Sequence, residues 1–111
     1  MVTVTINRND YGEINYFCSS GHAHFDEYGS DIVCAAVSAI LQTAVFGIIE
    51  NLGLEDILVK TEDGWLICDL EDYSSNDDVK LILEVMVTGL MKTEESYPDN
   101  LKVVEGGKKD A

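Results

Sequence analysis

The residues best suited to chemistry lie close together, since both histidines and one of the three cysteines fall within GHAHFDEYGSDIVCAAVSAI, residues 21–40. Ser30 or Asp31 is a candidate helix N-cap, because either side chain can accept hydrogen bonds from the first free backbone N–H groups of a helix. Cys34 would then lie about one turn into the helix, where the helix dipole favours the thiolate. The pattern predicts a nucleophilic cysteine, and the alternative is a small, buried core residue.

His22 is the candidate acid–base partner, because it precedes Cys34 by twelve positions and is joined to the helix by a loop long enough to fold back. A cysteine nucleophile needs a base within hydrogen-bond reach, and an imidazole can take the thiol proton and return it to a leaving amine. The alternative is a loop histidine exposed to water. Asp31 is either only a helix cap or the third member of a catalytic group with Cys34 and His22, in which it orients His22. Ser38 follows Cys34 by one helical turn and either bonds a backbone carbonyl or faces the site.

A metal site is a further alternative, because His22, His24 and Cys34 together supply three possible zinc ligands and leave a position open for water. Asp26 and Glu27 are nearby. The stronger zinc spacings, CxxC and HExxH, are missing from the chain. We therefore expect no metal and no cofactor. The other two cysteines lie in strand patterns, where packing is the expected role; they are Cys18 and Cys68.

Alternating and β-branched residues predict strands, and apolar residues at helical spacing predict helices. The expected strands cover residues 2–8, 14–20, 55–61, 65–70 and 101–105. A first helix is expected to run from the Ser30 or Asp31 cap to about Asn51, and a second from Ser75 or Asn76 to about Glu95. The order ββαββαβ predicts an α/β (α+β) fold, with a mixed or antiparallel sheet packed with two helices, one of them long and buried.

The chain is expected to form a single domain over residues 1–111, with a flexible polar tail at 105–111. The long helix is apolar on nearly all sides, so it must be buried in the core or against a partner subunit, which favours a homodimer. The loop at 21–30 contains Gly21 and Gly29 and has no clear period. We expect it to move and to close over bound substrate.

Charge and composition limit the partners. The chain has 7 basic and 21 acidic residues, a formal net charge of −14, which disfavours direct nucleic-acid binding. The acidity serves either solubility or attraction of a basic protein segment. An odd number of cysteines without an export signal predicts reduced thiols in the cytoplasm. No uncharged apolar run approaches the roughly 20 residues of a membrane-spanning helix, so no membrane association is expected.

The sequence GHA at 21–23, followed by DIVCAAVSA at 31–39, resembles the ribosomal-processing cysteine protease (Prp) family. The resemblance covers essentially the whole chain. It implies a small α/β homodimer that cleaves the N-terminal extension from a large-subunit ribosomal protein, after an aromatic residue in an apolar segment that basic residues follow. It implies a catalytic dyad of Cys34 and His22, a role for Gly21 in loop movement, and supporting roles for Asp31 and Ser38.

The sequence therefore predicts a cytoplasmic cysteine endopeptidase without a cofactor. A non-catalytic ribosome-assembly or binding module that uses the same acidic surface is the alternative from another class. A zinc enzyme is the third.

Substitution of the two histidines separates a dyad from a metal site. We expect His22→Ala to lower the rate of peptide cleavage by roughly 10²–10⁴-fold, the usual contribution of general acid–base catalysis. His24→Ala should have a smaller effect, because His24 has no role in the dyad. The measurement is initial rate on a substrate peptide, with and without a chelator. Equal losses at both histidines, or activity that a chelator removes and zinc restores, would instead support the metal site.

Overall fold

The computed structural model describes residues 1–21, 28–62 and 65–106, and for residues 28–31 the backbone alone. The elements follow the predicted order ββαββαβ. They are β1 (Val2–Arg8), β2 (Ile14–Ser20), α1 (Tyr28–Leu52), β3 (Leu58–Glu62), β4 (Trp65–Asp69), the 3-10 helix η1 (Glu71–Tyr73), α2 (Asp77–Ser96) and β5 (Leu101–Gly106). The predicted fold class is confirmed.

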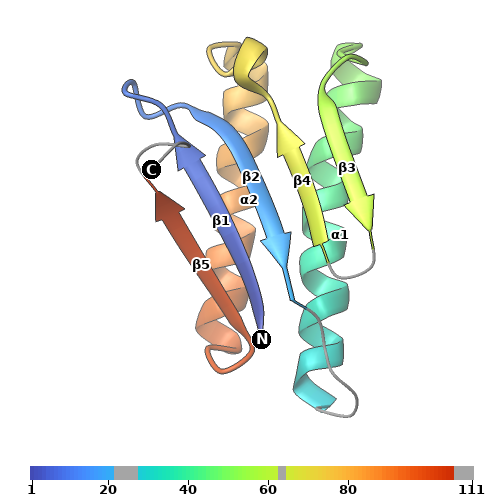
Figure 1. The fold of residues 1–111 in the computed structure, drawn as a ribbon, viewed down its shortest axis with the longest axis vertical. Coiled ribbons are helices and arrows are strands. Elements are labelled where there is room, and N and C mark those ends of the chain that lie inside the picture. The colour runs from blue at the N-terminus through green and yellow to red at the C-terminus, as the bar shows by residue number, and fades with distance from the viewer. Residues whose placement is uncertain (22–27, 63–64, 107–111) are drawn as a thin grey trace.

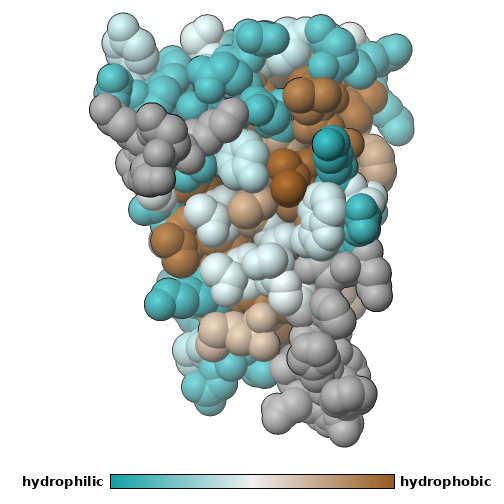
Figure 2. All heavy atoms as spheres, in the orientation of Figure 1, coloured by the Kyte–Doolittle hydropathy of each residue, from teal (hydrophilic) through white to brown (hydrophobic). Residues whose placement is uncertain are grey.

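The five strands form one mixed sheet in the order β3-β4-β2-β1-β5. Strands β1 and β2 form one antiparallel hairpin, β3 and β4 form another, and β2 pairs with β4 to join them. Strand β5 lies beside β1 and runs parallel to it. Both helices cover the same face of the sheet (Figure 1). Figure 2 looks onto the opposite face, where weakly polar residues separate the apolar ones.

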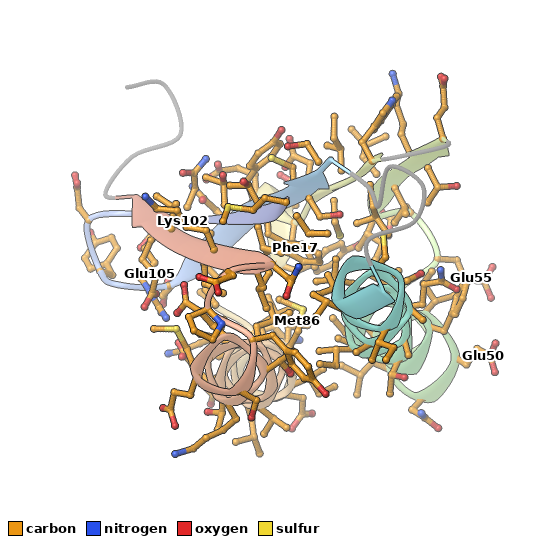
Figure 3. The ribbon with its side chains drawn as sticks, turned by 90° about the horizontal axis from the view of Figure 1, so that it is seen from below. Phe17, Glu50, Glu55, Met86, Lys102 and Glu105 are labelled. Atoms are coloured by element: carbon orange, nitrogen blue, oxygen red, sulfur yellow. The ribbon has the colours of Figure 1, made fainter. Side chains whose placement is uncertain are left out.

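The core lies between the sheet and the two helices. Successive side chains of a strand point to opposite faces, and in β1 the buried positions Val2, Val4 and Ile6 alternate with partly exposed ones. Phe17 from the sheet and Met86 from α2 meet in this layer (Figure 3). The second helix is fixed at its start by Asn76, whose side chain accepts hydrogen bonds from the backbone N–H groups of two residues in the first turn.

Helix α1 buries one face in this layer and exposes another. Its buried apolar residues are Val33, Val37, Leu41, Ala44, Val45 and Ile48, whereas Ile32 and Phe46 are 41% and 52% exposed. The expected burial is therefore complete on the sheet side only. By length and composition, the segment Ile32–Leu52 is apolar enough to cross a membrane, so the expectation that the chain has no such segment is wrong. Core helices of globular domains pass the same test, and this one packs on a sheet.

The structure differs from the sequence-based expectations at several element ends. Helix α1 begins at Tyr28, so Ser30 and Asp31 lie within it and the prediction that either is the N-cap is wrong. Acidic and hydroxyl residues are favourable both at the cap and in the first turn, so residue type alone does not locate the helix start. The expected loop at 21–30 therefore ends before Tyr28. Of the remainder, residues 22–27 lie outside the described part of the chain.

The second hairpin and the last strand also differ in extent. Strand β3 begins at Leu58 rather than at residue 55, because its pairing with β4 begins at Leu58 opposite Asp69 and residues 55–57 form a turn. The 3-10 turn η1 was not expected; Asp69 initiates it by accepting the backbone N–H of Glu71. At the other end, Glu105 and Gly106 pair with β1 and belong to β5. The rest of the expected tail, residues 107–111, lies outside the described residues.

Candidate active site

Cys34 lies on α1 and is half-buried at the border of the core. Because the helix begins at Tyr28, Cys34 is its seventh residue, which is nearly two turns from the start rather than one. The influence of the helix dipole falls off within the first turn. The helix end therefore supports a thiolate at Cys34 less than the sequence implied, and the partners of the sulfur matter more.

A cavity of about 200 Å³ opens beside Cys34. One wall is α1, which contributes Cys34, Val37, Ser38, Leu41 and Gln42. The other walls come from the N-terminal strand and the ends of three more strands, through Val2, Ser19, Gly21, Thr61, Glu62, Trp65 and Leu66. The cavity combines a thiol, an apolar wall and a few polar groups. Such a setting suits a nucleophile that works on an apolar peptide segment.

The structure brings three of the predicted site residues to this cavity: Cys34, Ser38 and Gly21. Ser38 is exposed and lies at the rim of the cavity, and its Oγ accepts a hydrogen bond from Nε2 of Gln42 at 2.8 Å. Asp31 is in the first turn of α1, and its side chain is outside the described part.

His22 and His24 also lie outside the described residues, so the geometry of the dyad is a prediction. Gly21 lines the cavity, and His22 follows it directly. The residue directly before His22 in the sequence therefore lies at the wall of the cavity that contains Cys34.

Gly21 has a conformation that other residues adopt only with strain. Its φ is +90°, and a Cβ built on it would lie 2.3 Å from the backbone carbonyl oxygen of Met1. Glycine avoids both problems because it has no side chain. The position directly after β2 thus requires glycine.

The remaining cysteines behave differently from Cys34. Burial raises the pKa of the Cys68 thiol to about 12, so this side chain stays protonated near neutral pH. Its predicted packing role is confirmed, because it is fully buried in the core. Cys18 is half-buried on β2, and both are free thiols. Among the described residues, no group of three His, Cys, Asp or Glu side chains could hold a metal; the proposed zinc ligands His22 and His24 are outside that part.

Sequence reasoning missed five polar or aromatic residues of the cavity: Ser19, Gln42, Thr61, Glu62 and Trp65. The signal for Gln42 was present, because it lies two helical turns after Cys34 on the same side of α1. The signal for Trp65 and Glu62 is their register, since they pair with each other and Trp65 also pairs with Ser20 at the end of β2. The pairing of Glu62 with Trp65 is local to one hairpin, but the register of β4 on β2 is a tertiary pairing that no local pattern revealed.

Comparison with known proteins identifies relatives along the chain. The family model described as "Cysteine protease Prp" matches residues 1–102. The chain is 35% identical over 103 residues to the ribosomal processing cysteine protease Prp of Staphylococcus aureus, covering 93% of this chain and 97% of that protein. It is 36% identical over 107 residues to the protein of that name from Bacillus subtilis, covering 93% and 96%.

Solved structures agree with these sequence matches. The crystal structure of the Staphylococcus aureus protease with a substrate peptide superposes with a TM-score of 0.86 at 36% identity, covering 96% of this chain and all of that one. A structure of the same protease with a covalently linked product peptide gives a TM-score of 0.79 at 35% identity, with the same coverage.

The geometry at Gly21 predicts a paired loss of stability and turnover. We expect Gly21→Ala to lower the free energy of unfolding by about 1–3 kcal/mol, because it combines backbone strain with a collision at Met1. Turnover per folded molecule should also fall, since relief of the collision displaces the start of the His22 segment. The measurements are chemical denaturation and cleavage rate at a temperature where the variant is folded.

Gly12→Ala is the matched control. Gly12 also has a positive φ, +79°, but nothing lies within 4 Å of an added Cβ, and it is not part of the cavity. This variant should lose stability through strain alone and keep its turnover. Normal turnover in folded Gly21→Ala would show that this glycine does not position the catalytic segment.

Proposed function

We propose that this chain, which belongs to the cysteine protease Prp family and is a cysteine protease, removes the N-terminal extension of a bacterial large-subunit ribosomal protein with a Cys34–His22 dyad. The observation that carries the proposal is the position of Cys34 in a cavity whose wall includes the residue directly before His22. The family match covers both residues. The relatives' names, and a relative's structure with a substrate peptide, support the substrate class.

The proposed reaction is a two-step acyl transfer. His22 takes the proton of Cys34, and the thiolate attacks the carbonyl carbon of the scissile peptide bond. His22 then gives that proton to the leaving amine as the C–N bond breaks, which leaves the acyl part of the peptide as a thioester on Cys34. Water, deprotonated by His22, hydrolyses the thioester and restores the thiol. The Staphylococcus aureus relative with its covalently linked product peptide is in keeping with a covalent intermediate.

The cavity and the charge of the chain fit an apolar segment next to basic residues. Leu41, Leu66 and Trp65 provide an apolar wall beside Cys34, which suits an aromatic or aliphatic side chain near the cut. The formal net charge of −14 attracts basic ribosomal protein segments over distances comparable with the Debye length. We propose the cytoplasm as the place of action, because ribosomal proteins are made and assembled there.

We also propose that the protein acts as a homodimer through the outer face of its two helices. A groove of about 660 Å³ lies between α1 and α2 on the side away from the sheet, lined mainly by Ala39, Ile40, Ala44, Leu81, Ile82, Val85 and Met86. Leu81 and Val85 are 66% and 63% exposed in the single chain. A contiguous apolar surface of this kind is typical of a protein–protein interface. A second copy satisfies it with the same apolar face.

Processing of the full-length precursor tests the enzymatic proposal. We expect the wild-type protein to lower the mass of the precursor by the mass of its extension. Cys34→Ala should leave the precursor intact, because this substitution removes the nucleophilic sulfur and changes little else. Cys34→Ser should be nearly inactive, since a hydroxyl is far harder to deprotonate than a thiol. Intact mass spectrometry checks the product. Cys18→Ala is the control and should stay active; normal processing by Cys34→Ala would overturn the mechanism.

A charge placed in the helix groove tests the dimer. We expect Leu81→Glu to convert the dimer to a monomer, because each copy would bury a carboxylate in the apolar interface. Leu58→Glu is the matched control, because Leu58 on β3 is 65% exposed but lies outside the groove; it should stay dimeric. Sedimentation velocity gives the mass of each variant. A monomeric wild type, or equal effects of the two substitutions, would contradict this interface.

A further inference from the structure

Ser38 and Gln42 continue the row of residues that begins at Cys34, with one helical turn between successive members. All three line the same cavity. The amide of Gln42 donates a hydrogen bond to the hydroxyl oxygen of Ser38. A hydroxyl that accepts this bond keeps its own proton for another acceptor.

The hydrogen bonding of the Ser38 hydroxyl differs from that of three threonine hydroxyls, one on α1 and two on α2. Thr43, Thr88 and Thr93 each donate to the backbone carbonyl four residues earlier, which is the common local bond for a hydroxyl within a helix. For Ser38, the structure records the bond from Gln42 instead. Within the described part of the chain, the proton of Ser38 is therefore not donated to a carbonyl of its own helix, and Ser38 lies one turn from Cys34.

We propose that Gln42 is a positioning residue, which holds the hydroxyl of Ser38 so that its proton is donated to the sulfur of Cys34 when the thiolate forms. Side chains four residues apart on a helix have Cβ atoms about 5–6 Å apart, so rotation about the Cα–Cβ bonds brings sulfur and hydroxyl into contact. A hydrogen bond to an ionised acceptor is stronger than a neutral one. The donation from Gln42 strengthens it further, because each bond of a chain polarises the next.

The charges around the cavity explain why the thiolate needs such a donor. The described ionisable side chain that shares the cavity with Cys34 is Glu62, at the end of β3. Its carboxylate opposes a second negative charge. The dipole of α1 acts weakly at the seventh residue of the helix. Hydrogen-bond donors that do not titrate, such as Ser38 and Gln42, stabilise the thiolate without changing the charge of the site.

The test is a double-mutant cycle read at Cys34 itself. The rate of iodoacetamide modification is measured against pH for wild type, Ser38→Ala, Gln42→Met and the double variant, with peptide mapping by mass spectrometry to count Cys34 alone. We expect Ser38→Ala to move the midpoint of the pH profile upward by roughly half a unit to one unit. Gln42→Met should move it upward by less, and should have no further effect in the Ser38→Ala background.

Two further variants separate this role from a general effect on the helix or the cavity. Ser38→Thr keeps the hydroxyl and should retain most of the wild-type profile. Glu62→Gln removes the opposing charge, so it should move the midpoint downward by a similar amount whether or not Gln42 is present. Additive effects of Ser38→Ala and Gln42→Met, or a profile unchanged by Gln42→Met, would overturn the proposal.

The role of Gln42 in turnover rests on the proposed function, and it is measured in a separate kinetic experiment. In wild type and Gln42→Met, kcat and KM on a substrate peptide should show a several-fold loss in kcat with little change in KM, because the bond acts on the nucleophile and not on substrate binding. If the wild type cleaves no peptide, the proposed function fails while the alkylation cycle still tests Gln42. A loss confined to KM would place Gln42 in substrate binding instead and would contradict the proposal.

Discussion

The packing of α1 on the sheet is the constraint on which the site depends. Val33, Val37 and Leu41 form a row of buried residues, at four-residue spacing, that anchors the helix in the core. Each is followed directly by a member of the row Cys34, Ser38 and Gln42. One residue along an α-helix is a rotation of about 100°, so the second row lies at the side of the buried face. The apolar anchor thereby sets the direction in which the thiol and its neighbours face.

Much of the fold followed from local patterns, because each strand and helix buries one face and so repeats its apolar residues at a fixed period. The first strand and the second helix were predicted nearly to the residue, and the Asn76 cap was one of the two candidates named. The start of α1 was not predictable in the same way. Ser30 and Asp31 are favourable both as a cap and in the first turn of a helix. The start of α1 therefore depended on the residues before them, whose sequence has no helical or strand periodicity.

The candidate site was predictable only where it is local in sequence. Cys34 and Ser38 could be placed together because one helix carries both, and the helix period is known. The β-strand walls could not, because Glu62 and Trp65 reach the cavity through the pairing of β3, β4 and β2. Gly21 was noted as a hinge, but its close approach to Met1 is a tertiary contact. Such contacts join residues distant in the chain, and no spacing rule anticipates them.

The three sides of α1 therefore face three different surroundings, and this explains why the helix is apolar on nearly all sides. One side anchors in the core, the next lines the cavity, and the third, with Ala39, Ile40 and Gly47, lines the groove against α2. A helix in a two-layer domain has no second sheet to cover its outer side. A contiguous apolar patch on such an outer side is typical of a protein–protein contact surface. The same helix lines both the cavity with Cys34 and this groove, so a partner at the proposed dimer interface would also contact an element of the candidate active site.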